Sequence, residues 1–208
     1  MGLVKAGSKG TLGTAPTGAA APEDWTALLE HADAGHRRHA AQALGDRPDA
    51  AATLAARLPR EPDPAVREAL LTALVRIGSP EAAAGLAPML ASEDAGLRNG
   101  ALESLQQMPV DAVEPQMDAL AGSDDSDLRI FAVLLAARLG PAERSARLHQ
   151  ALERDPHVNV GLTAAEAVAE LGDPAALPAL EAFAARFPDD PCVAYTVDAA
   201  RRRFRGAS

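Results

Sequence analysis

Three histidines near the start of the chain have a spacing that could serve a metal ion. His31, His36 and His39 lie close together, and His36 and His39 would share one face of a helix. Imidazole nitrogens are common ligands of transition metals, but a metal site needs more ligands than this cluster offers. We interpret the three residues as surface histidines and predict no metal site.

The single cysteine is the best candidate nucleophile. Cys192 follows Pro191 at the expected start of a helix, where a thiolate is favoured, but no histidine lies near it in sequence. The position is equally suited to packing. One cysteine excludes an intramolecular disulfide and fits a reducing compartment. The glycines are scattered and form no phosphate-binding loop. We therefore expect no catalytic residue, no cofactor and a cytoplasmic location.

One basic run lies near the carboxyl end of the sequence, at Arg201, Arg202, Arg203 and Arg205. The run would complete a final helix, where cations interact favourably with the helix dipole. The alternative is a site for an acidic partner or for nucleic acid. The chain has 20 Lys and Arg against 29 Asp and Glu, a net charge of −9. Such a surface repels a phosphate backbone, so general nucleic-acid binding is disfavoured.

The elements that must position these residues repeat along the chain. Apolar anchor residues recur at intervals of 31, 31 and 32 residues: Val66, Leu97, Leu128 and Val160. The position after each anchor holds Arg67, Arg98, Arg129 and then Gly161. The position three before each anchor holds Asp63, Asp94, Asp125 and then His157. A period near 31 predicts a solenoid of stacked supersecondary units.

Each unit is expected to be a pair of helices joined by a tight turn. The chain of 208 residues is 48% hydrophobic and only 3% aromatic, which favours close helix packing over strands. Glycines lie twelve residues past three anchors, where a helix end favours the left-handed conformation: Gly78, Gly140 and Gly172. Prolines follow them where second helices should start: Pro80, Pro141 and Pro174.

These patterns give a fold prediction for the whole chain. Residues 1–22 are rich in Gly, Ala, Thr, Ser and Pro and should form a flexible tail. Residues 23–205 should form an all-α, right-handed α-solenoid of about five helix-turn-helix repeats, with capping helices at about 24–32 and 191–204. No apolar run approaches the length of a membrane helix, so we expect a soluble protein.

Three short motifs resemble the bacterial HEAT-like repeats that also occur in phycobilisome lyases. They are residues 63–67 (DPAVR), 171–174 (LGDP) and 175–180 (AALPAL), and the resemblance covers residues 24–204. It implies that each Asp caps its helix and that the Arg of one unit pairs with an Asp of the next. His157 and Gly161 depart from that pattern, which predicts a weaker joint before the fifth unit.

Related repeats serve as scaffolds, chromophore lyases, hydroxylases and DNA glycosylases, so the resemblance does not choose a function. The hydroxylases carry several His-Glu pairs, and this sequence has no His-Glu dipeptide. The main expectation is a non-catalytic scaffold or adaptor, not an enzyme. The alternatives are a subunit of a bilin-lyase-like chromophore-attachment enzyme and, less well supported, a DNA-glycosylase-like solenoid.

The expected partner site is a concave groove lined by the second helices, with small residues that let another backbone approach. A partner helix or an extended peptide would lie there. The groove residues are Pro115, Gln116, Asp118, Ala119, Ala146, Arg147, His149, Gln150, Pro178 and Glu181.

A second surface is expected on the first helix of the fourth unit. Ile130 and Leu134 occupy positions that hold Glu68 and Thr72 two units earlier. They would form an exposed apolar strip on the convex side that supports a weak homodimer, unless a local tilt of the helix buries them within the chain.

Overall fold

The computed structural model describes residues 24–206, so the expected tail at 1–22 lies outside the described residues. Within them the chain forms twelve α-helices and short 3₁₀ segments, with no strand. The first helices of the successive units are α2 (Ala34–Leu44), α4 (Pro64–Ile77), α6 (Ala95–Gln107), α8 (Ser126–Ala136), α10 (Val158–Leu171) and, after the last complete unit, α12 (Pro191–Gly206). The second helices are α3 (Ala51–Arg57), α5 (Pro80–Leu86), α7 (Val110–Ala121), α9 (Pro141–Arg154) and α11 (Leu177–Arg186).

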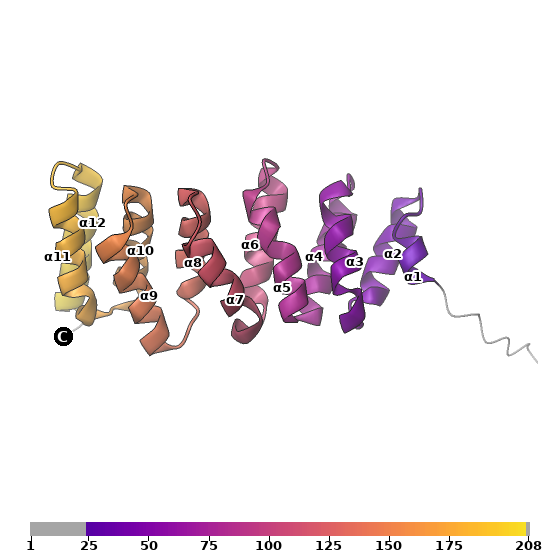
Figure 1. Ribbon diagram of the computed structural model, residues 1–208, viewed down its shortest axis with the longest axis horizontal. Coiled ribbons are helices and arrows are strands. Elements are labelled where there is room, and N and C mark those ends of the chain that lie inside the picture. Colours follow the sequence, from indigo (N-terminus) through magenta and orange to yellow (C-terminus); the bar gives the residue numbers. More distant parts are fainter. Residues whose placement is uncertain (1–23, 207–208) are drawn as a thin grey trace, which may run out of the picture.

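The helix pairs stand side by side in one row, which confirms the α-solenoid (Figure 1). Five pairs stack from α2 to α11, and α12 packs against α10 and α11 at the end of the row. A short helix, α1 (Trp25–Leu28), packs on α2 at the other end and stops earlier than the expected range of 24–32.

The repeated aspartates start the first helices. Asp33, Asp63, Asp94 and Asp125 are the N-caps of α2, α4, α6 and α8, and each side chain accepts a hydrogen bond from a backbone N–H of the first turn. A carboxylate at this position satisfies a donor that the helix leaves unpaired. The capping role expected from the resemblance is therefore confirmed at these four helices.

The turns follow the glycine and proline pattern with one exception. Gly78 and Gly172 have φ of 58° and 66°, the left-handed conformation expected of a residue that ends a helix. Gly140 does not, because α8 already ends at Ala136 and Gly140 is the N-cap of α9 with φ of −57°. The expectation for Gly140 is wrong. Pro80 and Pro141 are the first residues of α5 and α9, as predicted.

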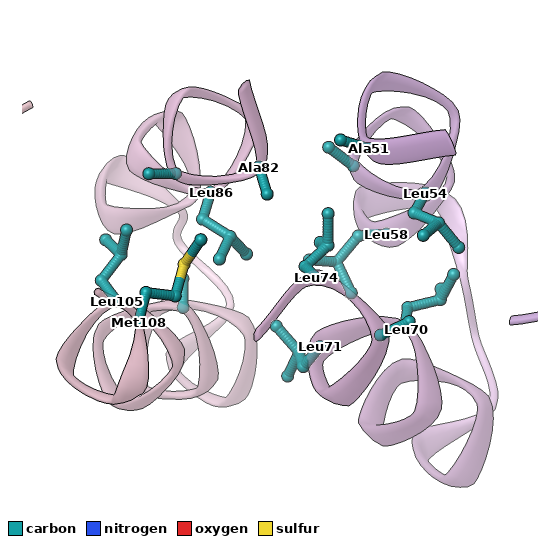
Figure 2. Packing of buried hydrophobic residues seen from close by; sticks show 14 of the residues in the cluster. Ala51, Leu54, Leu58, Leu70, Leu71, Leu74, Ala82, Leu86, Leu105 and Met108 are labelled. Carbon is teal, nitrogen blue, oxygen red and sulfur yellow. The ribbon is translucent and has the colours of Figure 1, made fainter. Parts of the chain in front are cut away.

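The core lies between the two layers of helices. Leu70 and Leu74 of α4 point toward Leu54 and Leu58 of the preceding unit, and all four side chains are fully buried (Figure 2). The first two sit four residues apart on one face of α4, which is the spacing that the apolar stripe predicts. Burial of each such side chain contributes roughly 1.5–3 kcal/mol.

The buried core divides into two clusters at the fourth unit. The N-terminal cluster extends from Leu29 to Leu139. The C-terminal cluster extends from Leu148 of α9 to Phe204 of α12, and Val133 of α8 also belongs to it. Helix α8 therefore contributes to both clusters.

The stack is loosest between the third and fourth units. Helix α7 packs on α8, but α6 and α8 touch at few residues and α7 hardly touches α9. By contrast, α3 packs on α5, α5 on α7 and α9 on α11. The joint before the fifth unit is instead tight, because α8 packs extensively on α10. The expected weaker joint is one unit earlier than the sequence predicts.

Candidate binding cleft between the third and fourth units

The loose joint coincides with a small residue in α9. The position 23 residues after each anchor holds Met89, Leu120, Ala151 and Phe183 in the second to fifth units. Leu120 and Phe183 are buried, and Met89 packs against the N-terminal core. Ala151 has no side chain beyond Cβ, so it cannot fill the equivalent space between α9 and α7.

A cleft of about 490 Å³ opens at this place. Its volume lies within the range of pockets that bind small ligands or single side chains. Met117, Ala132, Val133, Ala136 and Val160 give it apolar surface, and Ala121, Gly122 and Ser123 border it at the end of α7. The stripe of α9 that faces the cleft consists of Arg147, Gln150, Ala151 and Arg154.

A half-buried ion pair also lines the cleft. Arg129 Nε donates to Asp155 Oδ2 at 2.8 Å, Arg129 Nη2 donates to Oδ1 at 3.1 Å, and the two side chains are 12% and 10% exposed. Burial alone would raise the pKa of Asp155, but the hydrogen bonds from Arg129 and from the His157 N–H lower it below its ordinary value. The hydrogen bond to Asp155 raises the pKa of Arg129. The pair therefore stays ionised.

A second ion pair bridges the cleft from α9 to α7. Arg147 Nη1 donates to Asp118 Oδ1 at 2.6 Å, and Arg147 Nη2 lies 3.7 Å from Glu114 Oε1. The Asp118 side chain is 72% exposed, so water and salt screen much of this attraction. At this joint an exposed ion pair stands where the other second helices make apolar contacts.

Arg154 is the cation of the cleft that lacks a partner. Its counterpart one unit later, Arg186, donates to the carbonyl oxygens of Leu152 (2.8 Å) and Asp155 at the end of α9. Arg154 is exposed, and no hydrogen bond or ion pair joins it to another of the described residues.

Comparison with known families identifies the repeat. A model of HEAT repeats matches residues 22–106 and 113–199, most of the chain. The protein belongs to the HEAT-repeat family. A comparison with curated protein sequences finds no relative.

Solved structures similar to this HEAT-repeat chain include enzymes, enzyme subunits and designed proteins. Human deoxyhypusine hydroxylase is 18% identical at a TM-score of 0.42, covering 88% of this chain and 83% of its own. The complex of CpcE and CpcF of phycocyanin lyase from Nostoc sp. PCC7120 is 18% identical at a TM-score of 0.37, covering 95% and 100%. A designed armadillo repeat protein is 14% identical at a TM-score of 0.39, covering 86% and 98%. Similarities at this level carry no functional argument.

The repeated arginines differ from unit to unit in the partner with which they pair. Arg67 Nη1 donates to Asp94 at 2.7 Å, as the resemblance implies. Arg37 and Arg129 instead pair with Glu61 and Asp155, which occupy the same register position five residues before an anchor. Arg98 donates only to the Ser92 carbonyl and has no carboxylate partner among the described residues. The missing pair lies at the loose joint.

The structure places the ten predicted groove residues along α7, α9 and α11, but only two of them line the cleft. These two are Arg147 and Gln150, and Asp118 joins them through its ion pair with Arg147. The others lie outside it, either exposed (Pro115, Ala119, Ala146, Pro178, Glu181) or half-buried (Gln116, His149).

His149 faces the next unit. Its Nε2 atom is buried 3.5 Å from Asp173 Oδ2 and has no hydrogen-bond partner, while Ser145 Oγ donates to the same carboxylate at 2.9 Å. The Asp173 carboxylate therefore lies between the two side chains instead of behind the histidine. This order differs from that of a nucleophile activated by a histidine base.

The apolar strip on α8 is only partly exposed. Ile130 and Leu134 are both half-buried, and Ile130 packs against the C-terminal core. The chain itself therefore covers Ile130, which is the alternative to the exposed strip that the sequence analysis gave.

Ala151, Arg154 and Asp155 are among the cleft residues that sequence reasoning missed. A comparison of equivalent positions would have found Ala151, because the same position holds a large side chain in three other units: Met89, Leu120 and Phe183. The same comparison places Asp155 in register with Glu61.

The remaining candidates for chemistry lie apart from the cleft. His31 and His36 stack with ring centroids 4.2 Å apart, and His36 Nδ1 lies 3.0 Å from the capping carboxylate of Asp33. Within residues 24–206 no group of three or more His, Cys, Asp or Glu could hold a metal ion. Cys192 is exposed on α12. None of the helices described is long and apolar enough to cross a bilayer.

Proposed function

We propose that this HEAT-repeat protein is a non-catalytic scaffold that binds another protein along the face formed by its second helices. The observation that carries the proposal is the cleft between α7 and α9, which residues of both second helices line. Solenoids use their extended surfaces for partner recognition.

The charged groups of the cleft support binding over catalysis. Arg129 and Asp155 are joined to each other, and Arg147 is joined to Asp118 and Glu114. Groups engaged in this way hold the fold together and do not offer a free base or nucleophile. What remains for a partner is apolar surface, small exposed residues such as Ala119 and Ala146, and the guanidinium of Arg154. We place the protein in the cytoplasm of a bacterial cell, because its motifs resemble bacterial repeats and its lone cysteine fits a reducing compartment.

Affinity capture from the native host tests this proposal. The tagged wild type should retain a specific partner, and Ala119→Arg and Ala146→Arg should each lose it, because a bulky cation would block the second-helix face. Asn99→Arg adds the same side chain at an exposed position of α6 and should keep the partner. Unchanged capture by both alanine variants would place the partner site elsewhere.

A further inference from the structure

Building on the proposed function, we propose that the cleft between α7 and α9 binds a segment of the partner protein that presents one large apolar side chain next to a carboxylate. The fifth unit indicates the chemistry of this occupant, because the register positions of Ala151 and Arg154 hold a buried Phe183 and a hydrogen-bonded Arg186 there.

The apolar part of the occupant follows from Phe183. This side chain is fully buried in the fifth unit, at the register position that Ala151 holds in the fourth. The cleft beside Ala151 is lined by the apolar side chains of Met117, Val133 and Val160. A partner side chain of similar size would therefore bury apolar area that the chain leaves open.

The charged part follows from Arg154 and Arg186. Arg186 donates to two carbonyl oxygens at the end of α9, whereas Arg154, in the same register position, has no acceptor among the described residues. A carboxylate is a strong acceptor for a guanidinium, since the bond is charge-assisted and can be bidentate. Arg147 on the same stripe of α9 is already paired with Asp118 and Glu114, so Arg154 is the cation that would meet the carboxylate.

The shape of the site favours a protein segment over a free small acid. The cleft is bordered by the end of α7 and by α9, where Gln150 and Arg154 are exposed. Ala121, Gly122 and Ser123 at the end of α7 are small, so they leave room for the main chain that carries the anchor side chain.

The test uses NMR of the labelled full chain with short synthetic peptides as probes. The first peptide is capped Gly-Ser-Phe-Asp-Ser-Gly, and its two matched controls replace Phe by Ser or Asp by Lys. The Phe-Asp peptide should shift the backbone amides of Ala151, Arg154 and Val160. Each control peptide should bind roughly tenfold to hundredfold more weakly, which corresponds to losing one buried side chain or one charge-assisted bond.

Protein variants make the assignment specific. Ala151→Phe should occupy the cleft and abolish the response, and Arg154→Ala should weaken it. Arg205→Ala removes an exposed arginine of α12 and should leave it unchanged. Ala151→Leu fills the cleft with a smaller side chain than Ala151→Phe does. Circular dichroism verifies that each variant is folded. If both Ala151 variants unfold, Arg154→Ala alone decides.

Three results would overturn the inference. They are an absence of shifts at these amides, equal responses to all three peptides, and an equal response to phenylacetate, which would indicate a small-molecule ligand. Partner capture separates this inference from the proposed function. If Ala146→Arg loses the partner while Ala151→Phe keeps it, the scaffold proposal stands and the cleft is not the site.

Discussion

Gly161 of α10 lies directly under the ring of Phe183 of α11. A Cβ at position 161 would lie 2.7 Å from Cδ2 and from Cζ of that ring, closer than packed carbon atoms approach. Glycine therefore stands where the preceding units carry Arg67, Arg98 and Arg129, because the space of the arginine stem is taken by Phe183.

Gly161→Ala should destabilise the fold by about 1–3 kcal/mol, the usual cost of overpacking a core, measured by urea denaturation. Gly140→Ala is the matched control, since nothing lies within 4 Å of its added Cβ. That change should alter stability by less than about 1 kcal/mol, because restriction of the unfolded chain offsets the loss of a glycine at the N-cap of α9. The double variant Gly161→Ala with Phe183→Leu should cost less than the sum of the two single changes. Strict additivity would show that the ring and the glycine are not coupled.

Arg129→Ala should destabilise far more than Arg98→Ala. The first change leaves the carboxylate of Asp155, which is 10% exposed, without its cation, at a cost of about 3–5 kcal/mol. The second removes one hydrogen bond to the Ser92 carbonyl, worth about 1 kcal/mol. Chemical denaturation of both variants measures the difference. Similar losses would mean that Arg98 makes an inter-unit pair in solution.

Ala151→Leu should stabilise the protein by about 0.5–2 kcal/mol, because the added side chain fills the cleft beside α7. The control Ala146→Leu places the same side chain in an exposed position of α9 and should change stability by less than about 0.5 kcal/mol. Thermal unfolding followed by circular dichroism compares them. A loss of stability specific to Ala151→Leu would show that the cleft is too narrow for a leucine.

Glu61 should make the fold sensitive to acid. Its buried carboxylate accepts from Arg37 at 2.7 Å and lies 2.6 Å from Arg57 Nη2. Burial alone would raise the pKa of Glu61, but the bonds from Arg37 and from the Asp63 N–H lower it below its ordinary value. A lowered pKa gives stability that is full above the unfolded value of about 4.3 and is lost as pH falls through the folded value.

Urea midpoints across the acid range measure this contribution. Glu61→Gln should be less stable than the wild type at neutral pH and should lose less stability between neutral and acid pH. Parallel pH profiles for the two proteins would show that other carboxylates control the acid response.

Leu134→Glu tests the predicted homodimer without disturbing the core, because Leu134 is half-buried whereas Ile130 packs against the C-terminal cluster. If a dimer forms through α8, the variant should be folded and strictly monomeric by sedimentation. Ile130→Glu should instead lower thermal stability, by about 1–3 kcal/mol, since it places a charge against apolar side chains. A wild type that is monomeric at high concentration would exclude the dimer.

The sequence was sufficient for the features that recur along the chain. The 31-residue period, the four capping aspartates and the prolines that start α5 and α9 all follow from local rules of helix formation. The features that single out one joint were harder to find. Ala151 is one of many alanines in the chain and so did not stand out, and Arg98 matched its neighbours although its pair is missing. Such contacts depend on the angle between adjacent units, which no single helix determines.

The division of the core at α8 has a mechanical consequence. In a solenoid, each unit is held only by its neighbours, so stiffness is set joint by joint. Here two rigid blocks meet at one compliant link, and thermal bending should concentrate there instead of spreading along the row. A molecule bound between α7 and α9 would stiffen that joint. Its binding would therefore change the distance between the two ends of the solenoid.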